Sequence, residues 1–244
     1  MTVPDYALHE LCVVACAEAW RGDGEILASP IGVLPSVAAR LARATFSPDL
    51  LMTDGVASLV RGGVVEGWMP YRTVFDTVWS GRRHVMMGAS QIDRFGNQNI
   101  SCVGDHARPK AQLVGMRGAP GNTINHPTSY WIPSHTTRVF VPRVDVVCGV
   151  GFDRAASLGR AARFHGLRRV VTNLAVLDFE TPDHSMRLAS CHPGVPVEEV
   201  VRSTGFPLVV QADVPSTRAP TDEELRLLRE VIDPTASAAK ELAR

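Results

Sequence analysis

Helical and strand-like patterns alternate along the first part of this chain, and strand-like patterns dominate after it. Apolar residues recur with helical spacing in residues 4–20, 36–43, 72–80, 197–204 and 222–232. Short β-rich runs predict strands at 25–29, 49–55 (with its turn), 84–89, 99–103, 111–114, 134–141, 144–148, 168–179 and 186–190, and residues 56–70 are expected to form a loop. This order favours an α/β fold, with an open, mostly parallel sheet, flanking helices and an antiparallel extension.

The chain is long enough to bury a substantial core. Its 244 residues are 45% hydrophobic, which suits one large α/β domain or two small ones. No internal repeat, heptad or low-complexity block interrupts the sequence, and the one linker-like segment, residues 214–220, leads into a single helix. We therefore predict one domain over residues 1–244, with a C-terminal helix at 221–233 packed on it.

Charge and cysteine content exclude several classes of protein. Basic and acidic residues number 25 each, which gives no basis for binding nucleic acid or an anionic membrane surface. The N-terminal segment lacks the basic start of a signal peptide, and no apolar run approaches the roughly 18–20 residues of a spanning helix. Five cysteines without a CxxC pair favour a reducing cytoplasm, and we expect Cys12 and Cys16 to be buried packing residues.

A glycine-rich stretch at residues 111–122 is the first candidate for a binding site. A short apolar run leads into Gly115, Gly118 and Gly121, which are spaced three apart. Glycine adopts positive φ and lets a ligand approach the backbone, so such a turn can aim N–H groups at a phosphate or a developing oxyanion. Neither G-x-x-x-x-G-K-[ST] nor G-x-G-x-x-G is present, and a tight turn that binds nothing stays open as the alternative.

Other polar residues lie near predicted strand ends, where sheets of this class bind ligands. Asp54 precedes Gly55 at such an end, and a turn in which Asp54 caps the backbone is its structural alternative. Ser90 lacks the G-x-S-x-G context of a hydrolase nucleophile. Four histidines have a core or surface position as their ordinary interpretation, namely His126, His135, His184 and His192. The pattern indicates no metal site.

Four ordered blocks of sequence resemble the β subunit of class I coenzyme A transferases, of the glutaconate CoA-transferase kind. The blocks are residues 50–55, 85–99, 115–122, and 169–179 followed by 192–195 and 204–206. They occur in the order of that family, and the match spans roughly residues 10–210. The resemblance implies the open α/β fold of that family for this chain.

The resemblance also identifies a departure at the position of the family's nucleophile. In that family a glutamate in a Glu-Asn-Gly-like motif attacks the thioester, and the glycine loop supplies an oxyanion hole. Thr53 stands at the position of the glutamate, Asp54 at that of the asparagine, and Arg117 where a glycine is usual. Transfer needs a carboxylate that becomes an acyl anhydride and then carries CoA. Threonine cannot do this, and the carboxylate of Asp54 would leave the strand in another direction.

Within the superfamily, the chain is similar to the β subunits of actinobacterial steroid ring-cleaving hydrolases. The blocks that carry this narrower match are residues 66–71, 118–126, 129–131 and 182–187. The similarity implies an α2β2 enzyme that opens the last ring of cholesterol-derived CoA thioesters by adding water across a C–C bond. It also implies that the general base is a glutamate on the α subunit, which is a separate chain.

Site roles follow from the resemblance combined with the residue chemistry. Backbone N–H groups of Gly118 and Ala119 are the expected oxyanion or enolate donors, at about 3 kcal/mol each. Asp54 is expected to position groups near Thr53. The CoA thioester is expected to contact Gly115, Arg117, Gly121, Asn122, Asn125 and His126. Neither a metal nor a permanently bound cofactor is expected, since the CoA thioester is the substrate.

Two other functions stay open at this stage. The chain is alternatively a true class I CoA transferase subunit that uses Asp54 or a partner carboxylate as the nucleophile. It is alternatively a non-catalytic subunit that only completes an interface, in which case the glycine loop is scaffolding. The three functions differ in whether CoA is exchanged between acids, and in whether turnover depends on Gly118.

Overall fold

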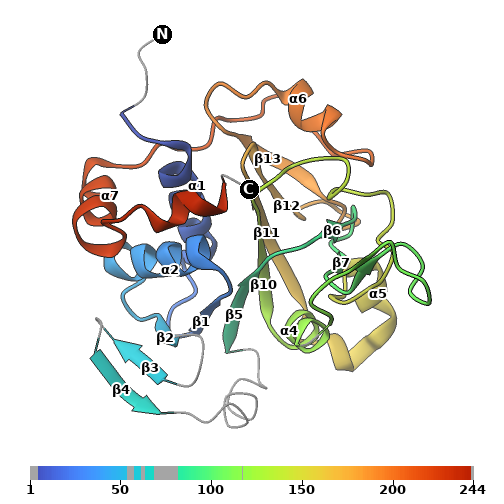
Figure 1. The fold of residues 1–244 in the computed structure, drawn as a ribbon, viewed down its shortest axis with the longest axis horizontal. Helices are drawn as coiled ribbons and strands as arrows, with labels where there is room; N and C mark the ends of the chain where they lie inside the picture. The colour runs from blue at the N-terminus through green and yellow to red at the C-terminus, as the bar shows by residue number, and fades with distance from the viewer. Residues whose placement is uncertain (1–4, 54–57, 62–63, 69–81, 117, 243–244) are drawn as a thin grey trace. The chain divides into compact units, whose positions relative to one another are not determined.

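The computed structural model describes residues 5–53, 58–61, 64–68, 82–116 and 118–242 (Figure 1). These residues form two compact units. Unit 1 contains the chain up to Met87 together with the segment from Arg218 onward, and unit 2 contains Gly88–Thr217. The C-terminal helix therefore belongs to unit 1, and a single domain over residues 1–244 stays a prediction.

The sheet of unit 1 has three parallel strands followed by an antiparallel ribbon. Its strand order is β5-β1-β2-β3-β4. Strands β5 and β2 each pair in parallel with β1, whereas β3 pairs antiparallel with β2 and with β4. The strands are β1 (Leu27–Pro30), β2 (Leu51–Thr53), β3 (Ser58–Arg61), β4 (Val64–Trp68) and β5 (Arg83–Met87).

Helices α1 (Leu8–Ala17) and α2 (Val33–Thr45) pack against each other in unit 1. Helix α1 is buried along almost its whole length, as expected of a helix that is apolar all round. It begins four residues later than predicted, because the Glu10 carboxylate accepts a 2.8 Å hydrogen bond from the Ala7 N–H and caps the helix there. A short 3-10 turn, η1 (Glu18–Trp20), continues it.

The cysteines confirm the prediction of buried packing. All five are free and buried. Burial raises the pKa of the Cys12 thiol to about 12 and raises that of Cys16 well above its usual value. Both thiols therefore stay protonated near neutral pH and behave as small apolar groups on α1.

The C-terminal segment of unit 1 is fixed by arginine–carboxylate pairs. Helix α7 (Asp222–Leu227) starts at a Thr221 cap and continues as a single π-helical turn, η3 (Leu228–Ile232), which confirms the predicted helix at 222–232. Arg218 binds both Glu18 and Glu224. A last 3-10 helix, η4 (Ser237–Glu241), follows, and its Glu241 carboxylate accepts a 2.7 Å hydrogen bond from the first N–H of α2.

The sheet of unit 2 has the order β13-β12-β11-β10. Strands β10 (Pro127–Ile132) and β11 (Gly166–Thr172) are parallel, and β12 (Ala175–Asp178) and β13 (Arg187–Cys191) extend them antiparallel. Its fully buried core includes Tyr130, Ile132, Val170, Leu177 and Leu188. Combined with unit 1, this arrangement confirms the predicted fold class of parallel strands with flanking helices and antiparallel extensions.

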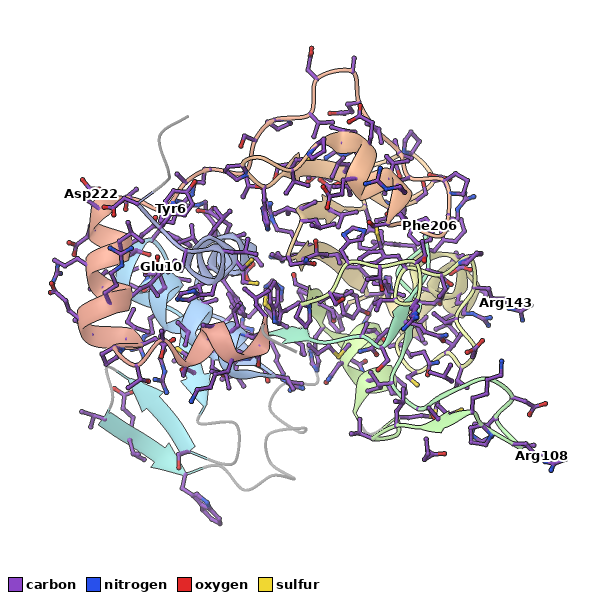
Figure 2. All side chains as sticks on the ribbon, turned by 45° about the horizontal axis from the view of Figure 1, so that its top comes forward. Tyr6, Glu10, Arg108, Arg143, Phe206 and Asp222 are labelled. Atoms are coloured by element: carbon purple, nitrogen blue, oxygen red, sulfur yellow. The ribbon has the colours of Figure 1, made fainter. Side chains whose placement is uncertain are left out.

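Shorter elements complete unit 2. They are β6 (Gln91–Ile92), β7 (Gln98–Asn99), β8 (Cys102–Val103), β9 (Ala111–Gln112), α4 (Ala119–Asn125), α5 (Phe152–Ala155), η2 (Ala156–Ala162) and α6 (Val197–Arg202). Phe206 packs inside this unit against the Phe140 ring, whereas Arg108 and Arg143 extend outward from its surface (Figure 2). In the described part of the chain, no helix has both the length and the apolarity needed to cross a membrane.

Several predicted elements were wrong. Residues 134–141 and 144–148 form loops, because the Thr136 carbonyl accepts from the N–H groups of both Val139 and Phe140 and closes a local turn. Residues 168–179 form two strands, because the Thr172 hydroxyl accepts from the Leu174 and Ala175 N–H groups and turns the chain.

The expected loop at 56–70 was also wrong, since β3 and β4 lie within it. Strand β10 and helix α4 were not predicted at all. The predicted helix at 72–80 lies outside the described residues, as do Asp54 and Gly55. The predicted strand at 99–103 is divided between β7 and β8. The other predicted strands, and the helices at 36–43 and 197–204, are present with shifted boundaries.

Candidate functional site

The glycine-rich loop leads directly into helix α4. Gly115 has φ +90° and so adopts the left-handed conformation that favours glycine. Gly118 has φ −83° and precedes the first residue of α4, and Gly121 lies inside the helix. The backbone conformation therefore requires glycine at Gly115 but not at Gly118.

Packing against the described residues does not require glycine at the other two positions either. A Cβ atom added at Gly118 would lie 3.7 Å from the Asn122 amide nitrogen, which is ordinary contact. Among the described residues, a Cβ atom at Gly121 would meet nothing within 4 Å. Gly118 is the N-cap of α4, where glycine is a favoured residue, whereas Gly121 inside the helix costs roughly 0.5–1 kcal/mol relative to alanine.

Of the two predicted oxyanion donors, the Ala119 N–H is already bonded within the loop. The Ala119 N–H donates to the Met116 carbonyl at 3.0 Å. To donate to a substrate oxygen as well, it must share its hydrogen between the two acceptors, or this turn must open slightly. The Gly118 carbonyl accepts from the Asn122 N–H at 2.8 Å within α4. Arg117 lies outside the described residues. The donor roles of Gly118 and Ala119 stay predictions.

Three polar residues predicted to line the substrate lie on α4, with Asn122 at its middle, Asn125 as its last residue and His126 as its C-cap. The Asn125 amide donates to the Gly121 carbonyl at 3.0 Å. The His126 N–H donates to the Asn122 carbonyl at 3.0 Å, and both of these side chains are buried. The structure thus brings Asn122, Asn125 and His126 together on one short helix with the glycine loop, and their contact with substrate stays a prediction.

Two residues that sequence reasoning missed hold this helix in place. Pro120 occupies the first turn, where its missing N–H costs nothing and its fixed φ suits a helix. The Thr123 hydroxyl accepts a 2.9 Å hydrogen bond from the Val150 N–H and ties α4 to the loop before α5. The Pro-Gly pair at 120–121 is typical of a turn, which is why the helix was overlooked, although a proline at a helix start was the available signal.

Thr53 is the last residue of β2. Its backbone pairs with Leu59 of β3, and the preceding Met52 pairs with Ala28 of β1. Thr53 therefore ends a parallel strand at its carboxyl end, the edge at which open α/β sheets bind ligands. Asp54 lies outside the described residues. Thr53 belongs to unit 1, whereas the glycine loop and α4 belong to unit 2.

The polar residues of the 85–99 block serve the scaffold. The Asn97 amide donates to both carboxylate oxygens of Asp93 and, at 2.9 Å, to Asp153. Its oxygen accepts from the Gly151 N–H at 2.8 Å. Burial raises the pKa of Asp93, while the Asn97 amide and backbone N–H groups stabilise its carboxylate. These bonds fix the turn between β6 and β7 onto the start of α5.

The histidines His135 and His192 occupy core positions, as expected. His135 stacks on Phe140 at 3.9 Å, and its ring nitrogens bind the hydroxyls of Thr172 and Thr204 at 3.1 and 3.0 Å. Burial lowers the pKa of His135 to about 3, so the ring is neutral and does not titrate near neutral pH. His192 binds the Thr172 carbonyl at 2.8 Å, and burial lowers its pKa as well.

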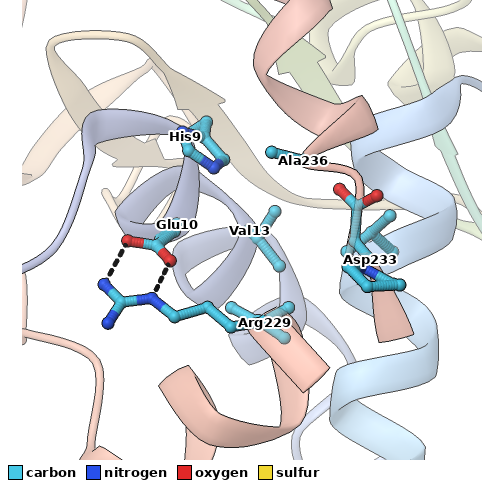
Figure 3. Close-up of a pocket in the computed structure, with 9 residues that line it drawn as sticks. His9, Glu10, Val13, Arg229, Asp233 and Ala236 are labelled. Carbon is cyan, nitrogen blue, oxygen red and sulfur yellow. Dashed lines mark hydrogen bonds and ion pairs between the residues drawn. The ribbon is translucent and has the colours of Figure 1, made fainter. Parts of the chain in front are cut away.

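A cavity of about 90 Å³ lies among α1, α2 and the C-terminal turns of unit 1. Its charged wall is formed by Glu10 and Arg229, which pair at 2.7 and 3.0 Å (Figure 3). The opposite wall includes Asp233, whose carboxylate accepts from the N–H and hydroxyl of Ser237. None of the predicted site residues lines this cavity. Across the described ranges, no group of three or more histidine, cysteine, aspartate or glutamate side chains is arranged to hold a metal ion.

Comparison with known proteins gives a consistent family. Residues 75–203 match the family described as coenzyme A transferase. The chain is 53% identical over 249 residues to the cholesterol ring-cleaving hydrolase IpdB subunit of Rhodococcus jostii, with 99% of this chain and 98% of that protein covered. It is 51% identical over 243 residues to the protein of the same name from Mycobacterium tuberculosis, with 96% and 97% covered.

A solved structure agrees with the sequence comparison. A chain in the crystal structure of Rhodococcus jostii RHA1 IpdAB superposes with a TM-score of 0.94 at 53% identity. The match covers 98% of this chain and 99% of that chain. At this similarity, the two chains share the same fold.

Proposed function

Because the chain belongs to the coenzyme A transferase family, we propose that it is the β subunit of a heteromeric hydrolase that opens a ring of a cyclic, steroid-derived acyl-CoA. Two relatives that are more than 50% identical over nearly their whole length carry the name cholesterol ring-cleaving hydrolase IpdB subunit. The IpdAB structure supports a partner chain of the α type. The bond cleaved is a C–C bond of a β-keto-type CoA thioester.

This proposal rests on one observation, namely that residue 53 is a threonine. It lies at the carboxyl end of β2, where the resemblance places the glutamate of the transferases. A glutamate there would form the acyl anhydride and then the enzyme–CoA thioester. A threonine hydroxyl forms neither of these intermediates, so hydrolysis fits this residue and CoA transfer does not.

The reaction divides between the two chains. Water adds to the ring ketone, and the carbon that departs becomes an enolate of the thioester. The N–H groups of Gly118 and Ala119 are placed in this proposal to stabilise the enolate oxygen, at about 3 kcal/mol per donor. The proton of the attacking water goes to a glutamate of the α subunit acting as general base. Asn122, Asn125 and His126 line the substrate at the other end of α4.

The same proposal includes the cofactor requirement, the compartment and the assembly state of the enzyme. The CoA thioester is the substrate, and no further cofactor takes part in water addition or C–C cleavage. We place the enzyme in the cytoplasm as an α2β2 assembly. Support for a reducing compartment comes from the cysteines, since all five are free and buried.

The test uses the chain co-expressed with its α-type partner chain. The purified complex is given a cyclic β-keto acyl-CoA, and ring opening is followed by liquid chromatography and mass spectrometry in H₂¹⁸O. One ¹⁸O atom is expected in the ring-opened product. In parallel, the complex is given acyl-CoA with a free carboxylic acid and labelled CoA, and no exchange is expected.

Two results would defeat the proposal. Exchange of CoA between acids, with a borohydride-reducible thioester on this chain, would make it a transferase subunit that uses another carboxylate. Ring opening by the α chain alone would make this chain a non-catalytic partner.

A further inference from the structure

Unit 2 carries a group of exposed arginines at the end of α5 and along η2. The arginine group consists of Arg154 on α5, Arg160 on η2 and Arg163 at the C-cap of η2, and all three are exposed. Among the described residues, none of the three forms an ion pair with a carboxylate, in contrast to Arg21, Arg94, Arg187, Arg218, Arg226 and Arg229. The neighbouring acid, Asp153, is bonded instead to the Asn97 amide at 2.9 Å and to the Arg154 backbone N–H at 2.8 Å. The group therefore presents positive charge that the described residues leave uncompensated.

The backbone brings two of these arginines onto one face of η2. Gly159 has φ +52° and ends the first turn of η2. In the second turn, the Arg163 N–H donates to the Arg160 carbonyl at 3.4 Å, and side chains three residues apart in a 3-10 helix lie one above the other. The Arg163 guanidinium also lies 4.6 Å from the centre of the Phe164 ring, which limits its freedom. Like charges in this arrangement repel each other, and an anion that binds both of them removes the repulsion.

The end of η2 lies beside the last turn of α4. Helix α4 and η2 are in contact (Figure 1). A ring nitrogen of His165 donates to the Val150 carbonyl at 3.0 Å, and the Val150 N–H donates to the Thr123 hydroxyl of α4 at 2.9 Å. Gly166 pairs with Pro127, the residue that follows the C-cap of α4. The arginine group is therefore next to the end of α4 that points away from the glycine loop.

The proposed function gives the substrate a direction along α4. It places the thioester at Gly118 and the polar lining at His126, on opposite ends of the helix. CoA continues from the thioester through the pantetheine arm to a nucleotide that carries a diphosphate and a 3′-phosphate. Helix α4 has seven residues and is about 10 Å long, so the extended pantetheine arm is longer than the helix. The nucleotide then lies past the His126 end, where the arginine group is.

We propose that Arg154, Arg160 and Arg163 bind the phosphate groups of the CoA nucleotide. The inference rests on the proposed function, because the direction of the substrate is taken from it. The planar guanidinium group donates two parallel hydrogen bonds to a phosphate and keeps its charge at any physiological pH. Two such groups at Arg160 and Arg163, one above the other on η2, match a ligand that carries several phosphate oxygens close together.

The experiment measures nucleotide binding to the co-expressed complex without turnover. The variant is Arg160→Gln with Arg163→Gln, and the matched control is Arg143→Gln with Arg202→Gln, which removes the same charge from exposed positions of the same unit (Figure 2). Dissociation constants for CoA and 3′-dephospho-CoA are measured by isothermal titration calorimetry at low ionic strength, and that for pantetheine by competition with CoA. For CoA, the variant is expected to raise the dissociation constant roughly 10-fold or more, whereas the control is expected to raise it less than about two-fold. The affinity for pantetheine is expected to be unchanged in both.

The two CoA probes distinguish which phosphate is bound. If the variant weakens 3′-dephospho-CoA as much as CoA, the arginines bind the diphosphate. If it weakens CoA alone, they bind the 3′-phosphate. Either result supports the proposal, and addition of Arg154→Gln should weaken CoA binding further.

Four results would overturn the proposal. They are unchanged CoA binding in the variant, an equal loss of pantetheine affinity, an equal loss of CoA affinity in the control, and dissociation of the complex in the variant alone, which would assign the arginines to carboxylates of the partner chain. In the ring-opening assay, the variant should raise KM and leave kcat unchanged, because the arginines contact no reacting atom. Selective loss of CoA affinity in a complex that never opens the ring would refute the proposed function and leave the phosphate site standing.

Discussion

The substitution Gly118→Ala separates a catalytic role of the glycine loop from a scaffolding role. Gly118 has φ −83° and ψ −1°, which alanine adopts without strain. Among the described residues, the new methyl group would touch the Asn122 side chain at 3.7 Å or more, which is ordinary contact. A glycine-to-alanine change at a compatible position stabilises a protein by about 0.4–1 kcal/mol through the unfolded chain. This gain offsets most of the roughly 1 kcal/mol by which alanine is less favourable than glycine at a helix N-cap. The variant is therefore expected to fold and assemble about as well as the wild type.

Turnover of Gly118→Ala is expected to fall sharply. If the thioester oxygen lies against the N–H of Gly118, a methyl group on the same residue holds that oxygen away from the donor. Loss of one oxyanion donor lowers kcat by about 100-fold or more, which corresponds to about 2.7 kcal/mol of transition-state stabilisation. We expect a loss of this size in kcat, measured by the rate of ring opening in the αβ complex at saturating substrate.

A matched control makes the result interpretable. Gly166, at the start of β11 in the same unit, has room for a Cβ atom with nothing within 4 Å. Gly166→Ala is expected to keep full activity and an unchanged melting temperature. If Gly118→Ala retains turnover within about two-fold, the loop is scaffolding and the reasoning from its unexplained glycines fails. Equal losses in both variants would show that the assay reports general damage.

Three further predictions concern packing, pH and chemistry. Gly151→Ala would place a Cβ atom 2.5 Å from the Phe95 carbonyl oxygen, and we expect it to destabilise the protein by about 3 kcal/mol or more, seen as a lower melting temperature of the complex. Burial acts to raise the pKa of Glu10, but the Arg229 guanidinium outweighs it and holds that pKa below 4.5. The ion pair between Glu10 and Arg229 therefore stabilises the folded protein at neutral pH, and this contribution is lost as the pH falls through the lowered pKa of Glu10. The melting temperature of the wild type should exceed that of Arg229→Gln at neutral pH, and the difference should shrink below about pH 4.5. Thr53→Ala should retain ring opening within about five-fold, because its hydroxyl forms no covalent intermediate in the proposed reaction, and a loss of 100-fold or more would assign it a chemical role.

The parts of the fold that sequence reasoning predicted are those with strong local patterns. Helix α1 has eight apolar residues among its ten, and the C-terminal helix carries its own capping residues, so both were found. The apolar run that contains β11 and β12 was recognised as β structure, but its internal turn was not. That turn depends on one hydroxyl, of Thr172, which accepts two backbone N–H groups. Composition gives no sign of such a bond.

The errors occurred where pairing depends on residues far away in the sequence. Strands β3 and β4 form a ribbon against β2, and the Gly-Gly pair between their two apolar runs is a hairpin signal that was missed. Residues 134–141 have the composition of a strand, yet the His135 N–H is bonded to the Asn173 side chain and the Thr136 carbonyl is used within a local turn. In the second segment, no local pattern distinguishes the turn from a strand.

In the candidate site, too, some features could be predicted from the sequence and others could not. The left-handed conformation of Gly115 follows from general properties of glycine in turns. The hydrogen bond between the Ala119 N–H and the Met116 carbonyl could not be foreseen, because it depends on how the loop enters a helix that the Pro-Gly pair concealed. The significance of Thr53 came from the family pattern, since a threonine at the end of a strand is ordinary by itself. The proposed general base is beyond any reading of this sequence because it lies on another chain.

In the proposed mechanism, the side chain at the end of β2 decides whether the thioester is attacked by the protein or left intact for water addition. The strand is held by backbone pairing of Met52 and Thr53 with their neighbours, and this pairing makes no use of the side chain at the strand end. Glutamate and threonine therefore fit the same backbone. With glutamate, the carboxylate is acylated and the thioester exchanges CoA; with threonine, the thioester stays intact and acts as the electron sink for the carbon that departs. The second reaction still needs a base to activate water, and none is available from the threonine. The proposed mechanism therefore predicts that a partner chain supplies the carboxylate, and that this chain alone binds the acyl-CoA without opening its ring.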